Sequence, residues 1–82
     1  SIEGGSGDNE YSYLVGDDFL PEIFIGRSLR DLNLRKNYLV NVLAAGPTKC
    51  LTVNPPASYL LQEDHVLVVM GLMEDLQKLP QN

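Results

Sequence analysis

The sequence has few of the residues from which catalytic and metal sites are usually built. Cys50 is its single cysteine and His65 its single histidine. One cysteine excludes an internal disulfide and favours a reducing compartment, although a bridge to another chain stays open. No second ligand stands at a metal-site spacing from His65. Walker A, G-x-G-x-x-G and nucleophile-elbow motifs are absent. We therefore predict no enzyme and no cofactor chemistry, with Cys50 a small strand filler and His65 in a structural or solvent-facing role.

Positive charge is also scarce. Six Lys and Arg residues stand against eleven Asp and Glu residues, which gives a net charge of -5. This balance disfavours binding of nucleic acid or anionic lipid by the whole surface, although a local basic site remains compatible with it. No apolar run approaches the roughly 18 residues of a membrane span, and no signal peptide is visible. The chain could still be a soluble piece of a membrane protein.

What the sequence does contain is enough for one small domain. Its 82 residues, 44% of them hydrophobic and 21% charged, are typical of a folded globular chain. Residues 1–17 begin glycine-rich and polar and continue with the alternating stretch Tyr11–Val15, so we predict a flexible linker or an edge segment. Residues 18–82 are the predicted domain.

The clearest local signal is a short helix that begins after Ser28. Ser28 is a favourable N-cap, and Asp31 follows three residues later, near the positive end of the helix. A strand is expected before it at Phe19–Ile25, with Pro21 limiting pairing to one edge. Arg35-Lys36-Asn37 is predicted as a basic turn after the helix.

Three further strands and a final helix follow in the predicted order. A long apolar strand at Tyr38–Ala45 turns at Gly46-Pro47-Thr48 and returns as Lys49–Val53. Val66–Met70 is predicted as a central strand covered on both faces, and Leu72–Leu79 as the last helix. The result is an α+β fold: a small two-layer domain of order β-α-β-β-β-α with a mostly antiparallel sheet. We expect Leu32 and Leu76 in the core with Val42 and Val68, and the segment 57–61 to place Tyr59, Leu60 and Leu61 there.

Polar residues around the long strand are the candidates for function. Asn41 interrupts an apolar strand, where an unpaired buried amide costs about 1–3 kcal/mol; it either faces solvent or a neighbouring turn, or reads a ligand. Arg35, six residues earlier, is either a solvated turn charge or a forked donor for phosphate. Pro55-Pro56 ends a strand and could also form a rigid apolar shelf.

These residues also carry a family resemblance. The run G-x-S-L-x-x-L-x-L-R from Gly26 to Arg35, the strand after it, Pro55-Pro56 and the segment V-L-V-V-M-G from Val66 resemble the TrkA-C domain, also called RCK-C. The match covers about residues 18–80 and rests on order and spacing, because its motifs are diffuse. Asp64-His65 replaces the usual Gly-Asp before the last strand, and the hairpin turn is less basic than in many members.

The resemblance implies a cytoplasmic regulatory domain of a potassium channel, potassium uptake system or cation antiporter. Such domains usually form a homodimer, and in some bacterial members the dimer interface binds cyclic di-AMP. In those members an arginine after the first helix and an asparagine in the next strand contact the nucleotide. Arg35 and Asn41 match both types and their spacing of six. Val40, Pro55 and Pro56 would offer apolar surface to adenine.

The sequence thus predicts a regulatory ligand-binding and dimerisation module of a potassium or cation transport protein. The alternative is an oligomerisation domain of a transporter that binds no small molecule. A small enzyme is a third and weaker option. Which ion, which transporter and which flanking domains are involved does not follow from these residues.

Overall fold

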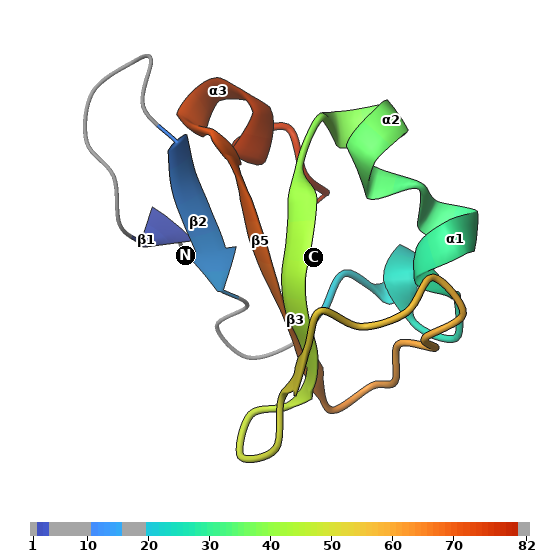
Figure 1. The fold of residues 1–82 in the computed structure, drawn as a ribbon. Coiled ribbons are helices and arrows are strands. Elements are labelled where there is room, and N and C mark those ends of the chain that lie inside the picture. The colour runs from blue at the N-terminus through green and yellow to red at the C-terminus, as the bar shows by residue number, and fades with distance from the viewer. Residues whose placement is uncertain (1, 4–10, 16–19, 81–82) are drawn as a thin grey trace.

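The computed structural model describes residues 2–3, 11–15 and 20–80, and its centre is a five-stranded antiparallel sheet (Figure 1). Its strand order is β1-β2-β5-β3-β4, so the last strand of the chain lies in the middle. The strands are β1 (Ile2–Glu3), β2 (Tyr11–Val15), β3 (Asn41–Pro47), β4 (Thr52–Val53) and β5 (His65–Leu72). The predicted α+β class and the central position of Val66–Met70 are confirmed. Met70 is partly exposed, so β5 is not covered along its whole length.

Short helices complete the domain. They are η1, a 3-10 helix (Glu22–Phe24), and the α-helices α1 (Leu29–Leu32), α2 (Leu34–Tyr38) and α3 (Met73–Leu76). In Figure 1, α1 and α2 lie on the β3 side of the sheet and α3 lies at one end of β5, where it packs beside β2 and β5. The final helix is shorter than the predicted Leu72–Leu79. No helix among the described residues has the length and apolar character needed to cross a bilayer.

The first predicted strand is wrong. Where Phe19–Ile25 was expected to be extended, Glu22–Phe24 forms η1, and Phe19 lies outside the described residues. The carbonyl of Pro21 accepts the N–H of Phe24 at 2.9 Å, which closes a tight turn that proline's fixed φ favours. The edge beside β5 is instead occupied by β2, at Tyr11–Val15. The order β-α-β-β-β-α therefore holds with β2 as its first strand, whereas the boundary at residues 17 and 18 stays a prediction.

The predicted basic turn is also wrong, because residues 35–37 belong to α2. Left-handed backbone bounds this helix on both sides, at Asn33 (φ 43°) and Leu39 (φ 61°). Asn37 stabilises the kink between α1 and α2, since its side-chain amide donates to the carbonyl of Leu32 at 2.8 Å. As a consequence the long strand begins at Asn41 and not at Tyr38.

The hairpin after β3 is confirmed, with a shorter second arm than Lys49–Val53. Ala44 pairs with Val53 and Ala45 with Thr52. Cys50 lies in the turn, where its N–H donates to the carbonyl of Pro47 at 2.9 Å, and its side chain is exposed. Its prediction as a buried strand filler is wrong, because the return strand begins only at Thr52.

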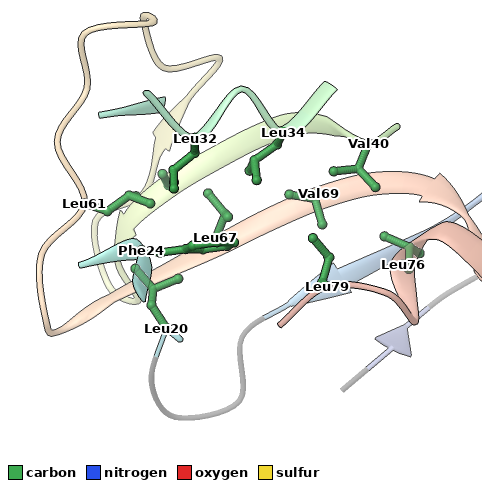
Figure 2. Close-up of a cluster of buried hydrophobic side chains, with 11 residues drawn as sticks. Leu20, Phe24, Leu32, Leu34, Val40, Leu61, Leu67, Val69, Leu76 and Leu79 are labelled. Carbon is green, nitrogen blue, oxygen red and sulfur yellow. The ribbon is translucent and has the colours of Figure 1, made fainter. Parts of the chain in front are cut away.

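The core lies between the sheet and the segments that carry η1, α1 and α2. Figure 2 shows Leu32 and Leu34 lying against Leu67 and Val69 of β5. Leu32 and Leu76 are buried as predicted, and Val42 and Val68 are half-buried. Segment 57–61 was expected to place three side chains in the core. Leu61 is fully buried and Tyr59 packs against the core, but Leu60 is 52% exposed. Alternation in an extended segment explains this, because neighbouring side chains point to opposite sides.

Candidate functional site

A surface cavity of about 450 Å³ lies between α1, α2, the start of β3 and the loop after β4. Its volume falls within the range of roughly 300–1,000 Å³ that is usual for small-molecule sites. The lining residues are Leu29, Arg30, Asn33, Leu34, Arg35, Val40, Asn41, Val42, Pro55 and Ala57. Four of the five residues predicted to bind a ligand are among them.

The helical wall of the cavity is set by local hydrogen bonds. The hydroxyl of Ser28 accepts the backbone N–H of Asp31 at 3.1 Å, so the predicted N-cap begins α1. Asn33 then ends α1 in left-handed geometry, which Asn tolerates better than most residues. This sharp change of direction starts α2 at once and brings Arg30 and Arg35 to the same cavity.

The opposite wall is a loop that is tied down at two places. At its start, the N–H of Asn54 donates to the carbonyl of Leu43 in β3 at 2.8 Å. Further on, the carbonyl of Ala57 accepts the N–H of Arg30 at 2.8 Å and that of Tyr59 accepts the N–H of Leu29 at 3.0 Å. The loop is thereby attached to both β3 and α1, and Pro55 is held across from the helices.

The beginning of β3 forms the base of the cavity. Asn41 is exposed, so its side-chain amide does not carry the free-energy cost of burying an unpaired polar group. Val40 is only 1% exposed and lies against Gly71, where a Cβ atom would come within 2.9 Å of a Val40 methyl group. Val40 therefore contributes mainly to the core, and only its outer surface reaches the cavity.

The charge of the cavity differs from that of the chain. Its lining holds two arginines and no acidic side chain, although the whole chain carries a net charge of -5. The described residues place no carboxylate within ion-pair distance of Arg30 or Arg35. Two guanidinium groups with unused donors, beside apolar surface from Leu29 and Pro55, suit an anionic ligand with a planar apolar part.

Not all of the predicted ligand-binding residues lie at the cavity. Arg35, Val40, Asn41 and Pro55 line the cavity, whereas Pro56 is exposed and outside its lining. That any of them contacts a ligand stays a prediction. Arg30 and Asn33 were missed, and the signal that could have found them is their spacing of three on the helix that Ser28 caps.

The other polar candidates lie elsewhere. His65 is buried, accepts the N–H of Gln62 through Nδ1 at 3.1 Å and lies against the ring of Tyr59. This arrangement stabilises the turn before β5. Among the described residues no group of three or more His, Cys, Asp and Glu side chains is arranged to hold a metal ion.

Comparison with solved structures connects this geometry to known proteins. No protein-family profile and no curated protein sequence matches the chain. The chain is similar to the RCK C domain of the potassium transport protein KtrA in complex with cyclic di-AMP, with a TM-score of 0.74 and 26% identity over 85% of this chain and 80% of that one. It also superposes on the GsuK RCK domain, with a TM-score of 0.70, 19% identity, and coverage of 85% of this chain and 15% of that one.

A third similar structure is the GsuK channel bound to NAD, with a TM-score of 0.71 and 19% identity over 82% of this chain and 12% of the channel chain. The chain thus spans a small part of the channel and most of the isolated KtrA domain. The shared sheet and helices confirm the resemblance found in the sequence. By its fold, this chain is an RCK-C/TrkA-C-like domain.

Proposed function

We propose that this chain is a cytoplasmic regulatory domain of a potassium or cation transport protein, and that its cavity binds cyclic di-AMP between two copies of the chain. The observation that carries this proposal is the cavity with two arginines and no carboxylate in an otherwise acidic domain. Similarity to the KtrA domain in complex with cyclic di-AMP supports the choice of ligand.

Each part of the ligand has a suitable partner in the cavity. Arg35 is placed to pair with a phosphate through charge-assisted hydrogen bonds, and the exposed amide of Asn41 can read a sugar or base edge. Leu29 and Pro55 offer apolar surface to adenine. A ligand with two-fold symmetry matches an isologous dimer, which gives one nucleotide for two chains.

Exposed apolar residues that flank a cavity-lining segment in the sequence support a partner chain. Leu39 is 65% exposed and Leu43 is 39% exposed, immediately before and after the segment from Val40 to Val42. Large exposed apolar side chains that gather in one region are typical of surfaces that bind another protein. The segment after Pro21 does not offer a strand edge to a partner chain, because Glu22–Phe24 forms η1.

Sedimentation equilibrium tests the dimer independently of the ligand. At micromolar concentration we expect twice the chain mass of 9.1 kDa, and a pair of this kind should bury more than about 1,200 Å² in total. A single species of 9.1 kDa, with and without nucleotide, would exclude the dimer.

The alternative is a domain that only oligomerises. The exposed Leu39 and Leu43 suit this function equally well, whereas the unpaired arginines of the cavity favour a ligand. A thermal-shift measurement separates the two, because a ligand selective for the folded state raises the unfolding midpoint. A dimer whose midpoint is unchanged by saturating cyclic di-AMP would favour the alternative.

A further inference from the structure

The cavity has a second polar wall, to which neither the sequence pattern nor the comparisons assign a role in binding. It consists of Arg30 on α1 and Asn33 at the junction of α1 and α2. We propose that Arg30 and Asn33 recognise the anionic group of the ligand together with Arg35, so that one phosphate is held by two guanidinium groups of the same chain. This proposal rests on the proposed ligand site and names further residues that select what the site binds.

The backbone of Arg30 is fixed while its charged end is unpaired. Its N–H donates to the carbonyl of Ala57 at 2.8 Å, which fixes α1 to the loop across the cavity. Its side chain is exposed and, within the described part of the chain, forms no ion pair. A guanidinium group on a fixed backbone loses less freedom on binding than one on a mobile loop, so this position is suited to ligand recognition.

Asn33 lines the same cavity as Arg30. It directly follows α1 as the C-cap, so the end of the helix contributes both residues to one lining. Asn33 has φ 43° and ψ 58°, a backbone geometry that favours Asn or Gly, and its side chain is exposed. The lining therefore holds two arginines and two asparagines, Arg30 and Arg35 with Asn33 and Asn41.

The charge of this wall determines the class of ligand. Arg30 and Arg35 line one cavity without an acidic neighbour in its lining, so both positive charges attract an anion that enters it. Two planar forks match the several oxygens of a phosphate better than a single carboxylate or a neutral nucleoside. The site should therefore prefer organic phosphates, with affinity that falls as salt rises.

The chain provides matched controls. Lys36 is exposed on α2, directly beside Arg35 in the sequence, and is outside the cavity lining. Lys36→Ala removes one positive charge, as Arg30→Ala does, but at a position outside the cavity lining. Asn33→Gly removes the amide while keeping a residue that accepts left-handed backbone. Arg30→Lys keeps the charge and removes the fork.

Titration calorimetry with cyclic di-AMP, and in parallel with ATP and adenosine, tests the proposal. We expect Arg30→Ala to weaken cyclic di-AMP binding about 10-fold to 100-fold, as loss of hydrogen bonds to a charged group predicts. Asn33→Gly should weaken it several-fold, Arg30→Lys should fall between Arg30→Ala and the unchanged chain, and Lys36→Ala should stay within about two-fold. Adenosine should not bind. Circular dichroism melts of each variant verify that the fold is retained.

The outcomes separate this inference from the ligand proposal. If cyclic di-AMP binds and Arg35→Ala abolishes binding while Arg30→Ala does not change it, the ligand proposal stands and the second wall is rejected. If cyclic di-AMP fails to bind but ATP binds in a manner that requires Arg30, the wall stands and the ligand proposal is rejected. Equal losses in Arg30→Ala and Lys36→Ala would mean that only overall charge matters and would overturn the role of Arg30. Binding of neither phosphate would reject both.

Discussion

The two halves of β3 show how one strand can serve both the core and the cavity. The first half, at Asn41 to Leu43, is exposed or half-buried and adjoins the cavity. The second half, at Ala44 to Gly46, is buried and lies between β4 and β5 in the sheet. A register irregularity between Val42 and Ala44 separates them. Bulges of this kind redirect side chains at functional edges, so a single strand here carries two different constraints.

Substitutions in β5 should give the largest difference in stability, because β5 pairs with both halves of β3. Leu67 lies opposite Ala45 and is buried, whereas Met70 lies opposite Asn41 and is 37% exposed. Leu67→Ala should lower the free energy of unfolding by about 2–5 kcal/mol. Met70→Ala should cost roughly 1 kcal/mol or less, because an exposed side chain leaves a smaller void. Urea melts of both variants measure the difference. Equal costs would mean that the two halves of β3 do not differ in packing.

Gly46 allows a test confined to the buried half. Its φ of +129° is unfavourable for residues with a Cβ atom, and such an atom would lie 3.0 Å from the Tyr59 hydroxyl and 3.2 Å from the Cys50 carbonyl. Gly46→Ala should therefore destabilise the domain by about 1–3 kcal/mol through strain and crowding. Gly26→Ala is a useful comparison, because φ is +81° there but no atom lies within 4 Å of the added carbon. A loss for Gly26→Ala as large as that for Gly46→Ala would assign the effect to backbone strain alone.

A substitution at Ser28 tests the stability of α1, which forms part of the helical wall of the cavity. Ser28→Ala removes the acceptor for the Asp31 N–H and should cost about 1 kcal/mol. The exposed Ser58 is the control, and Ser58→Ala should change stability by less than about 0.5 kcal/mol. Thermal melts compare the two variants. A Ser28→Ala variant as stable as its control would show that the cap contributes little to α1.

The smallest effects on stability are expected for exposed residues of the cavity, on α2 and in the first half of β3. Arg35→Ala and Asn41→Ala should each change the free energy of unfolding by less than about 0.5 kcal/mol, because both side chains are exposed. The same urea melts measure this. A loss above 1 kcal/mol for either would identify it as a structural residue and weaken its assignment to ligand binding.

The parts of the fold that the sequence predicted are those determined by neighbours in the chain. The Ser28 cap depends on Asp31 three residues away, and the hairpin at Gly46 depends on local turn residues. The first strand was misplaced because the edge of the sheet is settled by pairing between Tyr11–Val15 and β5, which are far apart in sequence. A strand and a 3-10 turn at Pro21 fit the local residues equally well, and only tertiary contacts distinguish them.

The candidate site was predictable only in part for the same reason. Arg35 and Asn41 stood out by residue type and spacing, and the family resemblance added Pro55 from another segment. Arg30 is typical of a solvated helix position, and its spacing of three from Asn33 does not by itself indicate that the loop containing Ala57 is bonded to α1. The contribution of α1 to the cavity became visible only in three dimensions.

Titration calorimetry with cyclic di-AMP on the unchanged chain, Arg35→Ala and Asn41→Ala tests the central claim most directly. The account predicts binding at one nucleotide per two chains, weakened at least about 10-fold by Arg35→Ala and measurably by Asn41→Ala, with both variants folded. No heat at tens of micromolar protein, or binding that survives both substitutions, would contradict it.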